Sequence, residues 1–230
     1  MRDLIDERMA EIATAISALI VMVSEWCHVW FDPRPHPWLI TFFALLVVAW
    51  AGVRFRKTLR VLRRMKQGRD GERIAGESLE KLRAYGYEIF HDIVAGNFNI
   101  DHVVVGPSGI YAIETKTISK RGGVEEKAEC DGESILIRGF PLPDNPVPQA
   151  KGNARWFAGY LHETSASRFR VIPVVLMPGW FVVNRAKQCD LLLLNEHENS
   201  LKSWIVDQAE TLSKADRALV SSRLSVLLRK

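Results

Sequence analysis

The chain has 230 residues, of which 47% are hydrophobic and 25% are charged, a composition typical of a compact domain with residues left over for an appendage. Its net charge of +4 arises in the first third, where residues 1–69 contain 11 Lys and Arg against 6 Asp and Glu, leaving 20 against 21 for residues 70–230. The larger part is nearly neutral, so overall charge alone gives no argument for nucleic-acid binding. The three cysteines form no CxxC pair and no even-numbered framework, so the sequence indicates neither a disulfide scaffold nor a zinc site.

Two apolar segments near the N-terminus predict a transmembrane helical hairpin. The second segment, WLITFFALLVVAWAGV, is sixteen residues without a charge, and its flanks extend the expected span to about residues 38–55. The first, at about residues 12–31, is also long enough to span a bilayer, but it contains Glu25 and His28. An amphipathic helix lying on the membrane surface is therefore its alternative. The prolines of DPRPHP separate the two helices, because proline does not continue a helix.

A basic run follows the second apolar segment. Residues 54–69 contain eight Lys and Arg and no acid. Positive charge beside a span marks the cytoplasmic side. We therefore expect residues 1–66 to form a membrane anchor with a basic juxtamembrane helix, and residues 67–230 to form a cytoplasmic domain at the cell membrane. A solvated basic helix and a DNA-binding stripe are the alternatives for this run.

The remainder of the chain predicts an α/β domain. The expected elements are a helix at 70–84, strands at 87–93, 99–105, 110–116 and 134–138, a helix at about 149–162, strands at 170–177 and 191–194, and a helical tail from 200. Helix, three-stranded antiparallel meander, helix and strand make a core in which helices cover both faces of a small sheet.

The segment IDHVVVGPSGIYAIETK at residues 100–116 predicts a hairpin with charges on a largely apolar face. A two-residue turn within GPSG places Asp101 opposite Glu114, and Lys116 shares the face of Glu114. Opposed carboxylates are destabilising unless positive charge lies between them, and carboxylates with waters are typical Mg²⁺ ligands. A salt bridge from Lys116 to one of the acids at the strand end is the alternative.

The helix before the hairpin carries a further acid. Glu72 lies on the same stripe as the apolar residues Ala75, Leu79 and Leu82, whereas Glu77 is rotated about 140° away. Glu72 is thus expected to point inward, where it either completes a metal site or favours the positive end of the helix dipole.

Four motifs of this domain follow one another: GRDGE at 68–72, GYEIFHDI at 86–93, NIDHVVVGPSGIYAIETK at 99–116 and NPVPQ at 145–149. Together they resemble the nuclease-related domain, NERD, a branch of the restriction-endonuclease-like PD-(D/E)xK superfamily. The resemblance covers about residues 68–160, and the third motif is the most specific. It implies a restriction-endonuclease-like core at about residues 68–177.

The resemblance also implies roles for individual residues. Asp101, Glu114 and Lys116 would be the D…ExK core, Glu72 the helix acid and Gln149 the downstream glutamine. Asp101, Glu114 and Glu72 would hold Mg²⁺ or Mn²⁺, a metal-activated water would attack the phosphodiester, and Lys116 would stabilise developing charge.

The resulting prediction is a membrane-anchored, cytoplasm-facing, metal-dependent endonuclease that acts on DNA. Its phosphate contacts are expected from Lys120, Arg121, Lys127, Lys151 and Arg155. His102 is expected to face away from Asp101 and to support the site. Two alternatives belong to other classes: a non-catalytic module that binds nucleic acid or a protein at the membrane, and a membrane scaffold organised by the hairpin.

Overall fold

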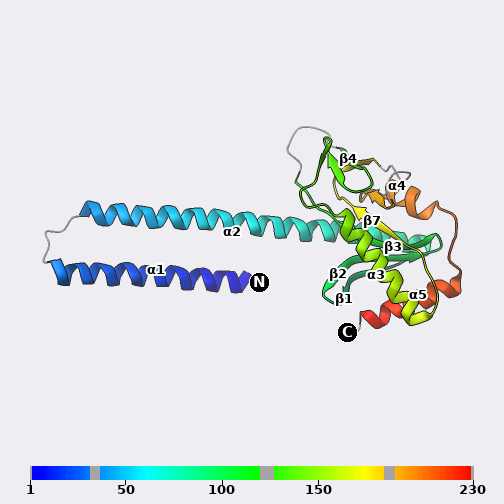
Figure 1. Ribbon diagram of the computed structural model, residues 1–230, viewed down its shortest axis with the longest axis horizontal. Coiled ribbons are helices and arrows are strands. Elements are labelled where there is room, and N and C mark those ends of the chain that lie inside the picture. Colours follow the sequence, from blue (N-terminus) through cyan, green and yellow to red (C-terminus); the bar gives the residue numbers. More distant parts are fainter. Residues whose placement is uncertain (1, 32–36, 120–126, 184–189, 229–230) are drawn as a thin grey trace. The chain divides into compact units, whose positions relative to one another are not determined.

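The computed structural model describes residues 2–31, 37–119, 127–183 and 190–228 (Figure 1). The chain divides into two compact units, Met1–Arg60 and Val61–Lys230. The helical elements are α1 (Arg2–Phe31), α2 (Pro37–Glu80), the 3₁₀ turn η1 (Lys81–Tyr85), α3 (Val147–Ser165), α4 (Glu198–Leu201), the π-helical turn η2 (Lys202–Val206) and α5 (Lys214–Leu227).

The first unit contains α1 and the beginning of α2. Within the described ranges, no helix combines the length and the apolar character needed to cross a membrane. The predicted transmembrane hairpin is therefore wrong, and with it the membrane anchor and the cell-membrane localisation of a cytoplasmic domain. The apolar stretch of α2 amounts to only about 24 Å of helix against a hydrocarbon core of about 30 Å, and α1 carries Glu25 among its apolar residues.

Helix α2 runs without a break for 44 residues. The sequence predicted a span, a basic helix and a separate helix from residue 70 in the same region. No proline occurs between residues 38 and 106 to end the helix, and the glycines at 52, 68, 71 and 76 weaken a helix without stopping it. The helix ends at Glu80 and passes into the η1 turn, which Gly86, with φ of 82°, closes in the left-handed conformation.

The second unit is built on a five-stranded sheet of order β1-β2-β3-β7-β9. Its strands are β1 (Glu88–Ala95), β2 (Phe98–Gly106), β3 (Gly109–Thr115), β7 (Val171–Leu176) and β9 (Leu192–Leu194). The first three strands pair antiparallel, and β3, β7 and β9 pair parallel. The predicted meander is confirmed, and the domain is a mixed α/β fold compatible with a nuclease-like core.

The β2–β3 register follows the predicted two-residue turn. Gly106 pairs with Gly109, and the ladder continues as far as His102 and Ile113. The next positions along the two strands belong to Asp101 and Glu114, as the turn length required.

Helices cover both sides of this sheet, as predicted. On one side, the end of α2 packs against β2 and β3 through Leu79, Val104 and Ile113, all fully buried. On the other side lie α3 and α5 (Figure 1), whose Phe157 and Leu224 belong to the buried cluster on that face. These two apolar layers hold the charged end of the β2–β3 hairpin in place.

A second sheet was only partly predicted. It has the order β6-β5-β4-β8, with β4 (Lys127–Cys130), β5 (Ile135–Ile137), β6 (Phe140–Pro141) and β8 (Phe181–Val183). The sequence indicated only the strand at 134–138. Strands of two to four residues are too short to show a hydrophobic period, so the rest of this sheet depends on pairing between distant segments.

Candidate functional site

Three acids lie at the same level on three neighbouring strands. The pairs that flank Asp92 and Asp101 put these two residues across from each other on β1 and β2, and the β2–β3 register continues the row to Glu114. Asp92 was not among the predicted site residues, although its position in the GYEIFHDI motif on the neighbouring strand was a signal for it. The row is a concentration of negative charge at one end of the meander.

Asp92 also marks a bend in β1. It is one of the few described non-glycine residues with positive φ, at 52°. Ile89 belongs to the apolar cluster on the α2 side of the sheet, whereas Ile93, four residues later, belongs to the cluster on the α3 side. Simple alternation would put both on one side. The strand therefore changes face at the level of the acids, although its register with β2 is the same before and after Asp92.

Asp101 is half-buried, and its carboxylate takes the place of a backbone carbonyl as a hydrogen-bond acceptor for β3. The Thr115 backbone N–H donates a hydrogen bond to Asp101 Oδ2 at 2.7 Å. Burial raises the pKa of Asp101 to about 6; the Thr115 hydrogen bond opposes this rise, and the charges of Glu72 and Asp92 add to it. Without a cation, the Asp101 carboxylate is only partly stabilised by its surroundings.

Glu114 is the most buried acid of the row, at 8% exposure. Burial and then the charge of Asp101 raise its pKa to about 8, against the lowering effects of Lys116 and Asn153. Asn153 of α3 donates from Nδ2 to Glu114 Oε2 at 3.1 Å. Asn153 is buried and was missed from the sequence, since no local pattern shows that this side of α3 faces β3.

Lys116 turns towards an acid outside the row. Its ammonium forms an ion pair with Asp144, in the loop before α3, and its backbone N–H donates to the Leu176 carbonyl at 2.9 Å. Its charge still lowers the pKa of Glu114. The structure thus shows a salt bridge for Lys116, but with a loop acid and not with Asp101 or Glu114.

Glu72 and Gln149 are two predicted site residues that are exposed. Glu72 is exposed on α2; burial of part of its side chain and the charge of Asp92 raise its pKa, and its own charge raises the pKa values of Asp101 and Glu114. Gln149 is exposed in the first turn of α3. Asn153, four residues later, is the α3 residue that contacts Glu114.

The acids offer a suitable donor set for a divalent cation. No group of three or more His, Cys, Asp and Glu side chains in the described part of the chain is arranged to hold a metal ion. Asp101 and Glu114 nevertheless provide two desolvated carboxylates that repel each other. Carboxylate oxygens suit Mg²⁺ and Mn²⁺, and a cation would relieve that repulsion.

His102 contacts the opposite side, towards α2. Its Nδ1 lies 2.7 Å from His91 Nδ1, and His91 Nε2 lies 2.8 Å from Glu80 Oε1. A Cβ added at Gly76 of α2 would lie 3.7 Å from the His102 ring. Burial, and then the charge of His91, lowers the pKa of His102 to about 4. The His102 ring is therefore neutral at pH 7 and packs under the hairpin, away from the acids.

The predicted phosphate contacts are mostly engaged elsewhere. Lys151 Nζ donates to the Gly132 carbonyl at 3.1 Å, Arg155 Nε donates to the Lys151 carbonyl at 3.3 Å, and Lys127 Nζ lies 5.8 Å from the Phe181 ring centroid. Lys120 and Arg121 lie outside the described residues. The three described cations therefore make local contacts, and none of them contacts the acid row.

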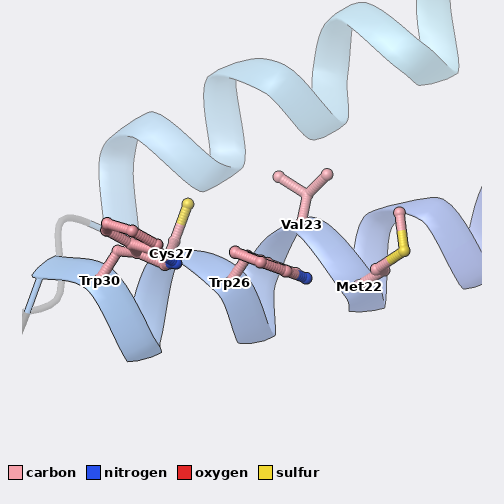
Figure 2. A pocket seen from close by; sticks show the side chains of 5 residues that line it. All are labelled: Met22, Val23, Trp26, Cys27 and Trp30. Carbon is pink, nitrogen blue, oxygen red and sulfur yellow. The ribbon is translucent and has the colours of Figure 1, made fainter.

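A large apolar pocket in the first unit is unrelated to this chemistry. Figure 2 shows its lining on α1, and its volume is about 790 Å³. The lining residues are Met22, Val23, Trp26, Cys27 and Trp30. These side chains include no carboxylate, amine or imidazole, so the acid row remains the candidate site.

A comparison with known families finds a match in the same part of the chain. Residues 67–178 match the family model described as the nuclease-related domain, NERD. The matched segment contains the whole acid row, Lys116 and Asn153. No curated protein and no solved structure matches the chain significantly. The family match supports the NERD resemblance of the motifs and a relation to nucleases.

Proposed function

We propose that this nuclease-related domain is a metal-dependent endonuclease that hydrolyses phosphodiester bonds in DNA. The observation that carries the proposal is the pair of desolvated carboxylates, Asp101 and Glu114, on adjacent strands, with Lys116 directly after the end of β3. Burying an acid costs folding free energy. Acids with strongly raised pKa values are therefore concentrated at functional sites, where that cost serves a purpose.

Asp101 and Glu114 would hold the cation, with Glu72 able to approach from α2. Mg²⁺ or Mn²⁺ supplies Lewis-acid stabilisation of negative charge on a phosphoryl oxygen. The carboxylates must be ionised to bind a cation, so the raised pKa values of both groups make binding weaker at low pH. Asn153 holds Oε2 of Glu114 and leaves Oε1 without a hydrogen bond among the described residues.

Lys116 would stabilise the charge that develops on the phosphate. To do so, its ammonium exchanges Asp144 for a phosphoryl oxygen. The Asp144 side chain is 91% exposed and that of Lys116 is 21% exposed, so water screens the pair on the Asp144 side, and the pair contributes on the order of 1 kcal/mol. The exchange therefore costs little free energy.

A non-catalytic module that binds nucleic acid or a protein is the second candidate function. The ion pair between Lys116 and Asp144 favours it, because the lysine of the ExK motif is engaged away from the acids.

A plasmid nicking and cleavage assay on the full chain tests the first function against the second. We expect cleavage with Mg²⁺ or Mn²⁺, none with EDTA, and none from the double variant Glu114→Gln/Lys116→Ala. The matched control is Glu77→Gln, which neutralises an exposed acid of α2 that forms an ion pair with Arg73 and should cleave normally. Cleavage by the double variant would refute the site. DNA binding without cleavage under every metal condition would favour the non-catalytic module.

A further inference from the structure

The basic run at residues 54–69 lies on α2, and its later part belongs to the second unit. Two of its cations, Arg63 and Lys66, line a groove of about 390 Å³ in the second unit. Its volume is within the range of about 300–1,000 Å³ typical of ligand sites. One wall of the groove is the face of α2 between residues 63 and 74.

The other wall lies at the carboxyl ends of the parallel strands. Thr117, Pro178 and Glu196 follow β3, β7 and β9, respectively, and all three line the groove. Ligands of sheets with parallel strands bind at this edge. The groove is therefore placed where the fold commonly receives a substrate.

The groove adjoins the candidate site through both of its walls. Gly71 and Thr117 line it, and they are the chain neighbours of Glu72 and Lys116. The two walls touch here: a Cβ added at Gly71 would lie 1.8 Å from Thr117 Oγ1. A polymer bound in the groove would thus pass directly beside Glu72 and Lys116, the residues proposed to contact metal and phosphate.

Two of the four charged residues that line the groove are cations, which suit a sugar-phosphate backbone. Arg63 and Lys66 are exposed, and neither forms an ion pair with a described residue. Between them and the strand ends, Ile74 and Pro178 supply apolar surface. The groove also contains two acids. Glu196 accepts a hydrogen bond at Oε2 from the Gly179 N–H at 2.8 Å, and Asp70 forms no ion pair with a described residue; both carboxylates oppose an anionic ligand.

We propose that this groove binds the backbone of a DNA strand next to the cleavage site, with Arg63 and Lys66 each contacting a phosphate. The inference rests on the proposed function for its ligand, DNA. It requires binding only and no cleavage, so the two proposals can be tested separately.

The test measures equilibrium binding of a fluorescent 20-base-pair DNA duplex to the full chain in EDTA, as a function of salt. Arg63→Gln/Lys66→Gln should weaken binding by about 10-fold or more at 0.1 M salt. It should also reduce the slope of log K against log salt by about 1.8, because each lost phosphate contact removes about 0.9. Thermal unfolding checks that the variant, whose changes are at exposed positions, remains folded.

The matched control is Lys57→Gln/Arg69→Gln, which removes one Lys and one Arg from the same helix. At 100° per residue, both positions lie more than about 100° from the centre of the groove face. We expect this control to keep the parent salt slope. Equal losses in the two double variants would mean that overall charge binds DNA, and this would overturn the groove. Asp70→Asn should bind more tightly, since it removes a charge that repels phosphate.

Cleavage measured in parallel separates the two proposals. If the parent does not cleave DNA, but Arg63→Gln/Lys66→Gln alone weakens DNA binding, the groove proposal stands and the nuclease proposal is refuted. If that variant has unchanged DNA affinity and an unchanged salt slope, and still shows metal-dependent cleavage, the groove proposal is refuted and the nuclease proposal stands.

Discussion

The two faces of the β2–β3 hairpin differ in the side chains that they bury. On the α2 side, Val104 and Ile113 are fully buried among apolar side chains. On the α3 side, Val103 and Ala112 are equally buried, but the hairpin then ends in Asp101 and Glu114. The α2 side contains only apolar packing here. The α3 side ends instead in two carboxylates, whose ionised forms are destabilised by burial. Proteins accept such local costs at functional sites.

The largest expected effect concerns catalysis on the acidic side. Asp101→Asn and Glu114→Gln should each reduce single-turnover DNA cleavage by about 10³-fold, comparable to the loss of an electrostatic catalytic group. Ile113→Val, which shortens a side chain on the apolar side next to Glu114, is the matched control and should cleave normally. If Ile113→Val lost as much activity as Glu114→Gln, the division between the two sides would be wrong.

The next effect concerns stability on the apolar side. Ile113→Ala should lower the free energy of unfolding by about 2–5 kcal/mol, as a cavity at a fully buried site does. Urea denaturation of the full chain measures it, with Val94→Ala at an exposed position of β1 as the control. A loss below about 1 kcal/mol would show that this side is not a tightly packed core.

A smaller effect of opposite sign is expected from Glu114 in metal-free protein. Its pKa is raised to about 8 in the folded state, so the native chain holds a proton that the unfolded chain releases. This contribution to stability is present at low pH and is lost as pH rises from about 4.5 through about 8. Glu114→Gln does not titrate and should be more stable than the parent at pH 9 in EDTA, by on the order of 2 kcal/mol.

Thermal unfolding at pH 4 and pH 9 measures this difference, and saturating Mg²⁺ should narrow it at pH 9 by stabilising the ionised parent. Equal stabilities at pH 9 would show that the Glu114 carboxylate is not destabilised by its surroundings.

The smallest effect concerns the amide that holds Glu114. Asn153→Ala removes a hydrogen bond that lowers the pKa of Glu114. The pKa should rise further, so that the pH dependence of cleavage shifts to higher pH, with a loss of about 0.5–1.5 kcal/mol in stability. Arg155→Ala, on an exposed face of the same helix, should leave the profile in place. A shift to lower pH in Asn153→Ala would contradict this role.

Much of the hairpin could be predicted because its determinants are local. The two-residue turn decided the register, and the apolar alternation decided which residues are buried. The membrane hairpin was wrong because an apolar segment is also compatible with a helix that does not span a bilayer, and the sequence does not state where such a helix ends. The continuous α2 shows this: its apolar beginning and its basic centre belong to one element.

The remaining parts of the site depend on contacts between segments far apart in the chain. Asn153 reaches Glu114 across 39 residues, and Lys116 reaches Asp144 across 28. The face change at Asp92 and the second sheet depend on such pairing as well, and no single segment shows them.

The sequence by itself determined the α/β order of the domain, the register of the β2–β3 hairpin and the position of Asp101 opposite Glu114. These features follow from turn length and side-chain period, which act over a few residues. Only the tertiary structure decided how deeply Glu114 is buried, which partner Lys116 takes and that Arg63 and Lys66 line a groove beside the acids. Burial and charge pairing are properties of assembled surfaces, and packing between distant segments sets them.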